Sequence, residues 1–182
     1  MRVILAEKPS VAQSIAAVLG ADQKKNGYLQ GENDLVSWCI GHLIELAPPE
    51  IYDARYAKWR REDLPIVSSA WENVVSDGTK KQFAVLKDLL NRTDVDEVVC
   101  ATDAGREGEL IFRMVYEKTG CTKPVKRLWI SSLEESAIRE GFRSLKPGTA
   151  YDALYRAALC RAQADWLVGI NGTRLYSRLY GT

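Results

Sequence analysis

The stretch DEVVCATDAGREGEL, residues 96–110, decides the fold that the sequence predicts. Its first part, Asp96–Thr102, is an apolar run that predicts a buried strand ending at Asp103. A helix is expected over Gly108–Lys118. Glycines at 105 and 108 let the backbone bend tightly between strand and helix and let a phosphate come close. The stretch therefore predicts a strand, a tight acidic turn and a helix.

The same alternation of strand and helix continues on both sides of this stretch. Capping-box patterns at Ser10 with Gln13 and at Ser132 with Glu135 mark two further helices, the second running to Leu145. Such alternation is typical of an α/β protein with a mostly parallel sheet that helices cover on both faces. The other expected elements are strands at Arg2–Glu7, Tyr28–Leu46 and Val125–Ile130, a long loop at Pro48–Pro65, and a helix at Thr79–Arg92.

The character of the chain changes near Gly148. We expect one α/β domain over residues 1–148 and the start of a helical domain over residues 149–182. Tyr151–Val168 reads as one alanine-rich helix, and residues 151–182 hold four arginines and two aspartates, a local excess of positive charge. The second segment has no evident partner helices, so we expect that domain to be truncated.

The composition limits the possible functions. The 182 residues are 46% hydrophobic and 27% charged with a net charge of +1, so any nucleic-acid contact must come from a local basic surface. Four cysteines without a CxxC pair and a single histidine argue against a structural zinc site, and Cys39 and Cys100 lie in apolar runs where buried thiols are expected. No secretory signal and no run of about 18–20 apolar residues occurs, so we expect a cytoplasmic protein without membrane contact.

Carboxylates gather around the first predicted strand and the acidic turn. Because neighbouring parallel strands end at the same edge of a sheet, we expect Glu7, at the end of the first strand, to face Asp103 and Glu107. Carboxylate oxygens at such an edge suit Mg²⁺, and repulsion among three carboxylates favours a shared cation or proton. Lys8 offers a point charge for a phosphate. The pattern predicts a general acid beside a metal ion.

Simpler interpretations of these residues stay open at this point. Glu107 and Glu109 would also complement the positive end of a helix dipole, and Glu7 and Lys8 would also fit an ordinary solvated strand end. The sequence holds neither a GxxxxGK[ST] phosphate loop nor a GxGxxG turn after the first strand. Their absence disfavours nucleotide hydrolysis of that type and a dinucleotide-binding fold.

A strand-end glutamate followed by a DxDxE-like turn resembles the Toprim domain, which topoisomerases, primases and some nucleases share. More specifically, the chain is similar to type IA DNA topoisomerases of the topoisomerase III branch, over essentially its whole length. The matching runs, in order, are AEKPSVAQSIA (6–16), GHLIELAPPE (41–50), TDAGREGELIF (102–112), SSLEESAI (131–138) and DWLVGINGTRLYS (165–177).

This resemblance implies roles for the residues of the acidic turn. Glu7 matches a glutamate that assists proton transfer to the leaving sugar oxygen and belongs to the metal site. Lys8 matches a lysine that steadies the scissile phosphate. Asp103 and Glu107 match the first and third acids of a Mg²⁺-binding triad. Arg106, between them, is expected to contact DNA.

Further roles follow for the helical segment. The resemblance places Arg161 and Asp165 where the family meets single-stranded DNA, and their spacing of four puts both on one helix face. A plain surface salt bridge is the alternative interpretation of this pair. Arg174 is a weaker candidate for a phosphate contact. His42 lies in the GHL run, and we expect it to make a structural hydrogen bond.

Two departures from the family pattern matter. Gly105 stands where the family has the middle acid, so we expect a single, weakly held ion. The family's cleaving tyrosine belongs to a motif that this sequence lacks, and none of its tyrosines, Tyr151, Tyr155, Tyr176 and Tyr180 included, lies in that setting. We therefore expect the chain to be inactive alone.

The resemblance thus implies the N-terminal fragment of an enzyme that relaxes or decatenates DNA. That enzyme cuts one strand, passes another and religates, without ATP, through a 5′-phosphotyrosyl bond. A Toprim nuclease or primase is the first alternative, and a non-catalytic DNA- or metal-binding module is the second. The expected setting is a monomer in the cytoplasm, associated with the nucleoid, with no protein partner indicated.

Overall fold

The computed structural model describes residues 1–181, which form a seven-stranded mixed sheet, a separate two-stranded sheet and surrounding helices. The strand order of the large sheet is β2-β3-β4-β1-β7-β8-β9. The strands are β1 (Arg2–Ala6), β2 (Gln23–Lys25), β3 (Tyr28–Gln30), β4 (Asp34–Trp38), β5 (Ile44–Leu46), β6 (Asn73–Val75), β7 (Glu97–Ala101), β8 (Val125–Arg127) and β9 (Lys146–Pro147). The helices are α1 (Pro9–Leu19), α2 (Pro49–Tyr52), α3 (Lys80–Leu90), α4 (Arg106–Thr119), α5 (Glu135–Arg143) and α6 (Asp152–Tyr180).

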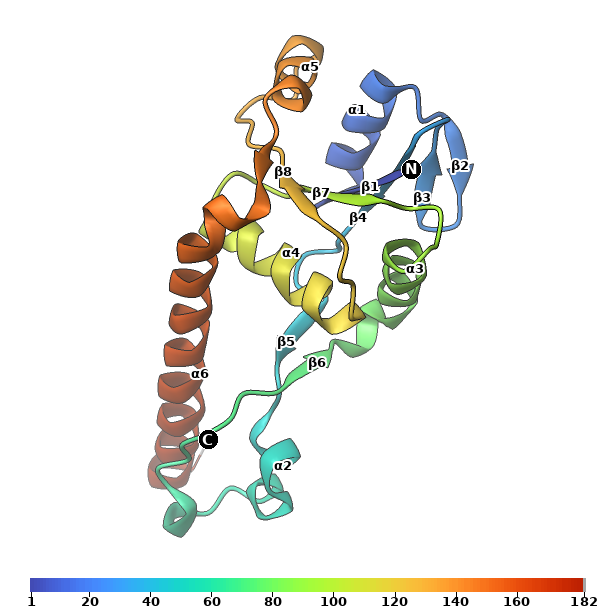
Figure 1. The fold of residues 1–182 in the computed structure, drawn as a ribbon. Helices are drawn as coiled ribbons and strands as arrows, with labels where there is room; N and C mark the ends of the chain where they lie inside the picture. The colour runs from blue at the N-terminus through green and yellow to red at the C-terminus, as the bar shows by residue number, and fades with distance from the viewer. Residues whose placement is uncertain (182) are drawn as a thin grey trace. The chain divides into compact units, whose positions relative to one another are not determined.

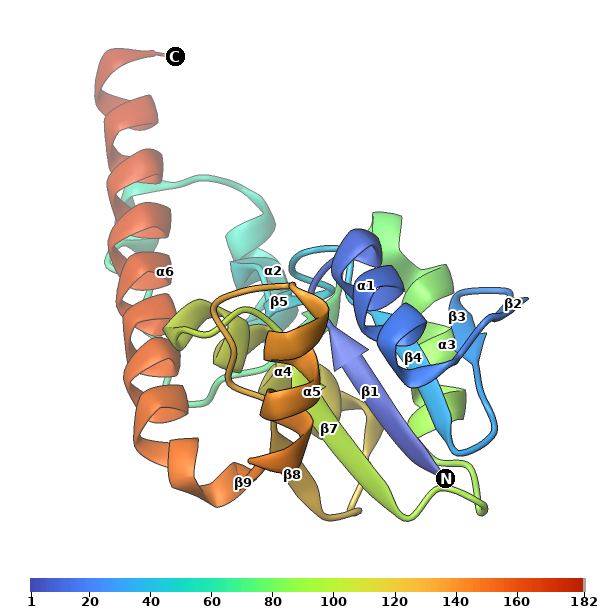
Figure 2. The same cartoon turned by 90° about the horizontal axis from the view of Figure 1, so that it is seen from above.

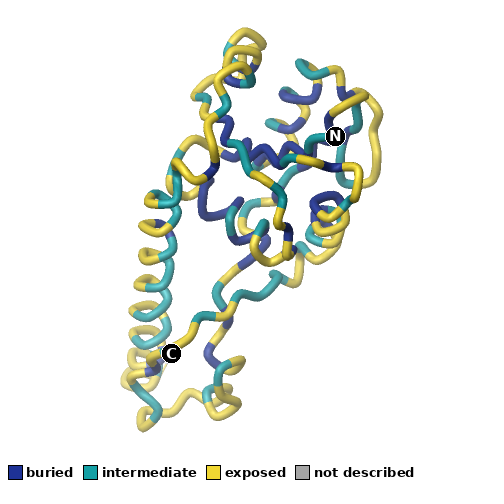
Figure 3. Tube along the Cα trace, in the orientation of Figure 1, coloured by how far each residue is buried: buried dark blue, intermediate teal, exposed yellow. Residues whose placement is uncertain are grey.

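Strand β1 is the centre of the large sheet. It pairs in parallel with β4 on one side, where Val3 is opposite Leu35, and with β7 on the other, where Val3 is opposite Val98. The run from Val3 to Ala6 is fully buried, as the tube in Figure 3 shows. A strand buried on both faces needs helices above and below it, which explains why β1 reads as a continuous apolar run.

Helices cover both faces of this sheet. Figures 1 and 2 show α1 and α5 on one face and α3 and α4 on the other. The first face packs Ile4 and Val36 of the sheet against Ile15 of α1 and Ile138 of α5. The prediction of a mostly parallel sheet covered on both faces is therefore confirmed, with antiparallel pairs only at the edges, β2-β3-β4 and β8-β9.

Both predicted capping boxes are wrong. Helix α1 begins at Pro9, with Lys8 at the N-cap, because a proline with its fixed φ is suited to the first helical turn; Ser10 then lies inside the helix. Helix α5 begins at Glu135, and Ser132 accepts the backbone N–H of Glu134 at 3.2 Å instead of capping the helix. In both cases the serine lies at the wrong place to serve as an N-cap.

The chain divides into two compact units. One contains residues 1–44 and 75–158; the other contains residues 45–74 and the chain from Leu159 onward. These units are defined by the contacts within each of them. The division that the sequence predicts, between a domain at residues 1–148 and a second at 149–182, stays a prediction.

The second unit contains the whole of Pro48–Pro65, the segment that the sequence predicts as a long loop. That segment holds α2 and short 3₁₀ helices at Ala54–Ala57 and Arg61–Asp63. The residues of α6 hold it in place: Trp166 packs edge-on against Tyr52 and Trp71 and donates to the carbonyl of Ala47 at 3.0 Å. Helix α6 continues to Tyr180, well past the predicted end at Val168. Among residues 1–181, none of the helices combines the length and apolar character that a bilayer crossing requires.

Candidate active site

The ends of β1 and β7 bring the first predicted site residues together. Ala6 and Ala101, the last residues of these strands, are paired in register, so Glu7 and Asp103 follow at the same edge of the sheet. The carboxylate of Glu7 accepts the backbone N–H of Asp103 at 3.3 Å through Oε2. The parallel pairing therefore produces the contact between Glu7 and Asp103 that strand order predicts.

Two further side chains, Lys8 and His42, complete this exposed surface. Lys8 Nζ lies 3.6 Å from Oδ2 of Asp103, and His42 Nε2 lies 2.6 Å from Oε1 of Glu107. The side chains of Asp103 and Glu107 are 54% and 65% exposed, so both carboxylates are open to water and to a substrate. His42 makes the hydrogen bond that the sequence predicts, and its partner is one of the predicted metal ligands.

The donor set fits a hydrated magnesium ion better than a closed cage. Within residues 1–181, no three His, Cys, Asp or Glu side chains gather into a group that could hold a metal ion. Asp103 lies beside Lys8, and Glu107 lies beside His42. Their oxygens are nevertheless the ligands that Mg²⁺ prefers, and Mg²⁺ is commonly bound by one or two carboxylates that leave several waters in place.

The two glycines of the turn play different parts. Gly105 has φ 174° and ψ 174°, ordinary extended backbone, and a Cβ built there would meet no atom within 4 Å. A Cβ on Gly108 would lie 2.2 Å from the carbonyl oxygen of Asp103, so only glycine fits at that position. Helix α4 begins at Arg106, two residues earlier than predicted, which puts the exposed Arg106 and Glu107 in its first turn.

A fully buried arginine lies beneath this turn. Arg127 of β8 is 0% exposed, and Nη1 donates to the carbonyls of Cys100, Thr102 and Leu128 while Nη2 donates to that of Asp103 at 2.8 Å. Its Nε lies 3.0 Å from Oε2 of Glu109, which is 1% exposed; this is an ion pair without hydrogen-bond alignment. Arg127 and Lys126 are the two charged residues of the predicted strand VKRLWI, and the presence of an arginine in a buried strand is the signal that sequence reasoning missed.

The buried charges extend to a second arginine. Arg113 Nε donates to the other oxygen of Glu109 at 2.9 Å, and Nη2 donates to Asp152 at 2.8 Å. Burial lowers the pKa of Arg113, but the hydrogen bonds to Glu109 and Asp152 outweigh it, so the net shift is upward. Burial raises the pKa of the neighbouring Cys100 thiol to about 11, against the opposing charge of Arg127. Glu109 is therefore occupied by two arginines and is not available as a metal ligand.

The predicted DNA-contacting residues of α6 belong to the second unit and differ in exposure. Arg161 Nε lies 3.5 Å from Asp165 Oδ2, and the two side chains are 61% and 72% exposed. Arg174 is almost completely buried: it donates to the carbonyl of Tyr56 at 2.7 Å, and its guanidinium lies 5.3 Å from the ring centre of Trp59. The side chains of Arg161 and Asp165 are thus open to a ligand, whereas the guanidinium of Arg174 is buried and bound to residues of its own unit.

Comparison with known proteins identifies the family of the chain. A family model described as "Toprim domain" matches residues 2–133, most of the chain. The chain belongs to the Toprim family. A protein named "DNA topoisomerase 3" from Shouchella clausii is 56% identical over 173 residues, which are 95% of this chain and 24% of that protein. One of the same name from Staphylococcus epidermidis is 51% identical over 178 residues, 98% of this chain and 25% of that protein.

These relatives confirm the resemblance to topoisomerase III that the five sequence runs indicate. The chain spans about a quarter of their length. Among solved structures, full-length topoisomerase I from Thermotoga maritima aligns with a TM-score of 0.61 and 23% identity, covering 91% of this chain and 24% of that one. At that identity the alignment supports the fold alone.

Proposed function

We propose that this chain supplies the acidic half of the active site of a type IA DNA topoisomerase of the topoisomerase III kind. The observation that carries the proposal is the contact between Glu7 and Asp103 at adjoining strand ends, with Lys8 beside Asp103. An acid, a cation and a further carboxylate at one open sheet edge suit phosphodiester chemistry.

Each residue has a distinct task in this proposal. Glu7 delivers a proton to the sugar oxygen that leaves when the strand is cut, and takes it back on religation. Lys8 holds the scissile phosphate by its point charge, and Arg106, exposed in the first turn of α4, adds a second contact to the backbone. Asp103 and Glu107 would hold Mg²⁺, which supplies positive charge against the phosphate when bound.

The nucleophile of this reaction is a tyrosine outside the 182 residues. Alone, the chain binds divalent metal and single-stranded DNA, the latter through Arg161 and Asp165, and does not relax supercoiled DNA. It acts as a monomer in the cytoplasm, near the nucleoid.

The test replaces the matching 173-residue segment of the Shouchella clausii protein with this chain and measures relaxation of supercoiled DNA. Relaxation is expected from the chimaera, and Glu7→Gln is expected to slow it by about 10²–10⁴-fold, the usual contribution of general acid–base catalysis. Binding of single-stranded DNA should change little, because glutamine keeps the size of the side chain and removes a negative charge near phosphate.

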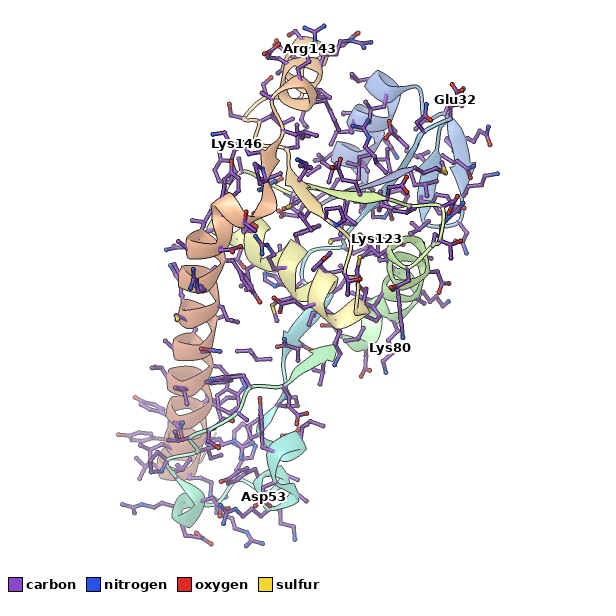
Figure 4. The ribbon with its side chains drawn as sticks, viewed as in Figure 1. Glu32, Asp53, Lys80, Lys123, Arg143 and Lys146 are labelled. Atoms are coloured by element: carbon purple, nitrogen blue, oxygen red, sulfur yellow. The ribbon has the colours of Figure 1, made fainter. Side chains whose placement is uncertain are left out.

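Glu32→Gln is the matched control. Glu32 carries the same functional group, lies in the turn before β4 at the opposite edge of the sheet, and is exposed; Figure 4 shows its side chain at the surface. It should relax DNA at the unsubstituted rate. A folded Glu7→Gln chimaera with undiminished cleavage across the pH range would remove Glu7 from the proposed role.

A further inference from the structure

Taking a guanidinium out of water is strongly unfavourable unless its donors are satisfied, so a fully buried arginine calls for an explanation. Arg127 is 0% exposed, yet it faces a single carboxylate, that of Glu109, which it shares with Arg113. Its other contacts are backbone carbonyls. The guanidinium of Arg127 therefore holds backbone carbonyls in place as well as pairing with a carboxylate.

Two of the four carbonyls that Arg127 binds, those of Thr102 and Asp103, belong to the acidic turn. Nη1 donates to Thr102 O at 2.8 Å and Nη2 donates to Asp103 O at 2.8 Å, so one planar group holds two consecutive residues where β7 ends. The hydroxyl of Thr102 closes the turn from the other side by donating to Gly108 O at 2.7 Å. The backbone that carries the carboxylate of Asp103 is therefore fixed from beneath.

We infer that Arg127 is a positioning residue: through the carbonyls of Thr102 and Asp103 it sets the direction in which Asp103 presents its carboxylate to a divalent cation. Glu109, two residues after Glu107 on α4, pairs with the guanidinium in turn, so Asp103 and Glu107, two of the three predicted metal ligands, are both linked to one buried charge. The inference rests on the proposed function, because it assigns a purpose to the geometry of that same site.

The shape of the side chain matters to this role. A guanidinium is a rigid planar fork that donates in several directions at once, whereas the ammonium group of lysine is a single point charge on a flexible stem. Lysine at position 127 would keep a positive charge near Glu109 but could not hold both carbonyls. Arg127→Lys therefore separates charge from positioning.

The experiment uses the 182-residue chain and two readouts. The first is the affinity for Mn²⁺, measured by electron paramagnetic resonance, with paramagnetic broadening of amide signals to locate the ion near Asp103. Groups that orient metal ligands typically change affinity 10–100-fold, so Arg127→Lys should bind Mn²⁺ at least about 10-fold more weakly. The second readout needs no metal: amide hydrogen exchange at Asp103 and Glu109, whose N–H groups bond to Glu7 and to Gly105, should become faster.

Arg2→Met is the matched control, because it removes another arginine–carboxylate pair of the same sheet. Arg2 binds Asp34 at 2.8 and 3.0 Å at the N-terminal ends of β1 and β4, opposite to the strand ends that carry the acidic turn. Loss of this pair should lower stability without changing Mn²⁺ affinity or exchange at the turn. If Arg127→Lys fails to fold, Glu109→Gln is the milder variant, and a smaller loss in the same direction is expected.

The outcomes separate this inference from the proposed function. Unchanged exchange at the turn together with unchanged Mn²⁺ affinity in Arg127→Lys or Glu109→Gln overturns the positioning role. A loss of affinity in Arg2→Met as large as in Arg127→Lys also overturns it, since the effect would then follow stability alone. If the unsubstituted chain binds no Mn²⁺ near Asp103, the metal site of the proposed function fails, and the exchange rates still decide whether Arg127 fixes the turn.

Discussion

Glu107 and Glu109 lie two residues apart on α4, but the first side chain is exposed to solvent and the second is buried. The side chain of Glu107 is 65% exposed and meets His42, whereas Glu109 is 1% exposed and is held between Arg113 and Arg127. Residues two apart on a helix point to different sides, so a single turn provides both a reactive surface and a buried anchor.

The difference in burial gives the two carboxylates different effects on stability. An exposed pair contributes about 0–1 kcal/mol to stability, which leaves Glu107 free to exchange partners. A buried pair is much more costly to break, since the partner is left charged and unsatisfied. The buried Glu109 therefore contributes to stability, and the exposed Glu107 is the carboxylate left open to the metal or substrate of the proposed function.

The strongest test of this contrast is the stability of two matched variants. Glu109→Leu should lower the free energy of unfolding by about 3–5 kcal/mol, because it leaves two arginines without their buried carboxylate. Glu107→Leu should change it by no more than about 0.5 kcal/mol, the usual range for exposed positions. Urea unfolding followed by circular dichroism measures both free energies of unfolding. Similar losses in the two variants would contradict the different contributions of the buried Glu109 and the exposed Glu107.

A smaller effect is expected from adding a carboxylate to the exposed layer. Gly105→Asp should bind Mn²⁺ about tenfold more tightly, equivalent to about 1.4 kcal/mol, since the position is extended and open to a side chain. Gly105→Asn, of the same size without the charge, serves as the control in the same titration. Equal affinities in the two variants would mean that the side chain at 105 does not reach the ion.

The smallest effect tests exposed charges of α6. Arg161→Ala should reduce the salt dependence of single-stranded DNA binding by about 0.7 in the slope of log affinity against log salt, the share of one phosphate contact. Stability should hardly change, because the pair with Asp165 is exposed. Arg178→Ala, another exposed arginine of the helix, is the control in fluorescence anisotropy titrations. An unchanged slope in Arg161→Ala favours the plain salt-bridge interpretation.

Sequence reasoning predicted what depends on chain order and periodicity. The central strands read as apolar runs, and parallel pairing then required Glu7 and Asp103 to meet. It missed what depends on three-dimensional partners. The proposed role of Arg127 depends on carbonyls of the turn after β7, and the pairing of His42 with Glu107 joins a loop to the first turn of α4, 65 positions later in the chain. The helix starts were wrong where Pro9 and Glu134 override the serine pattern.

The central position of β1 has a consequence for how the molecule folds. Its partner on one side, β4, follows within the first 38 residues. Its partner on the other side, β7, comes much later in the chain, and the contact between Glu7 and Asp103 that this pairing allows spans 96 positions. Closing such a long loop costs entropy before any contact rewards it, and non-local pairings form slowly. The candidate site at Glu7 is therefore completed only when this slow, long-range pairing of β1 with β7 has formed.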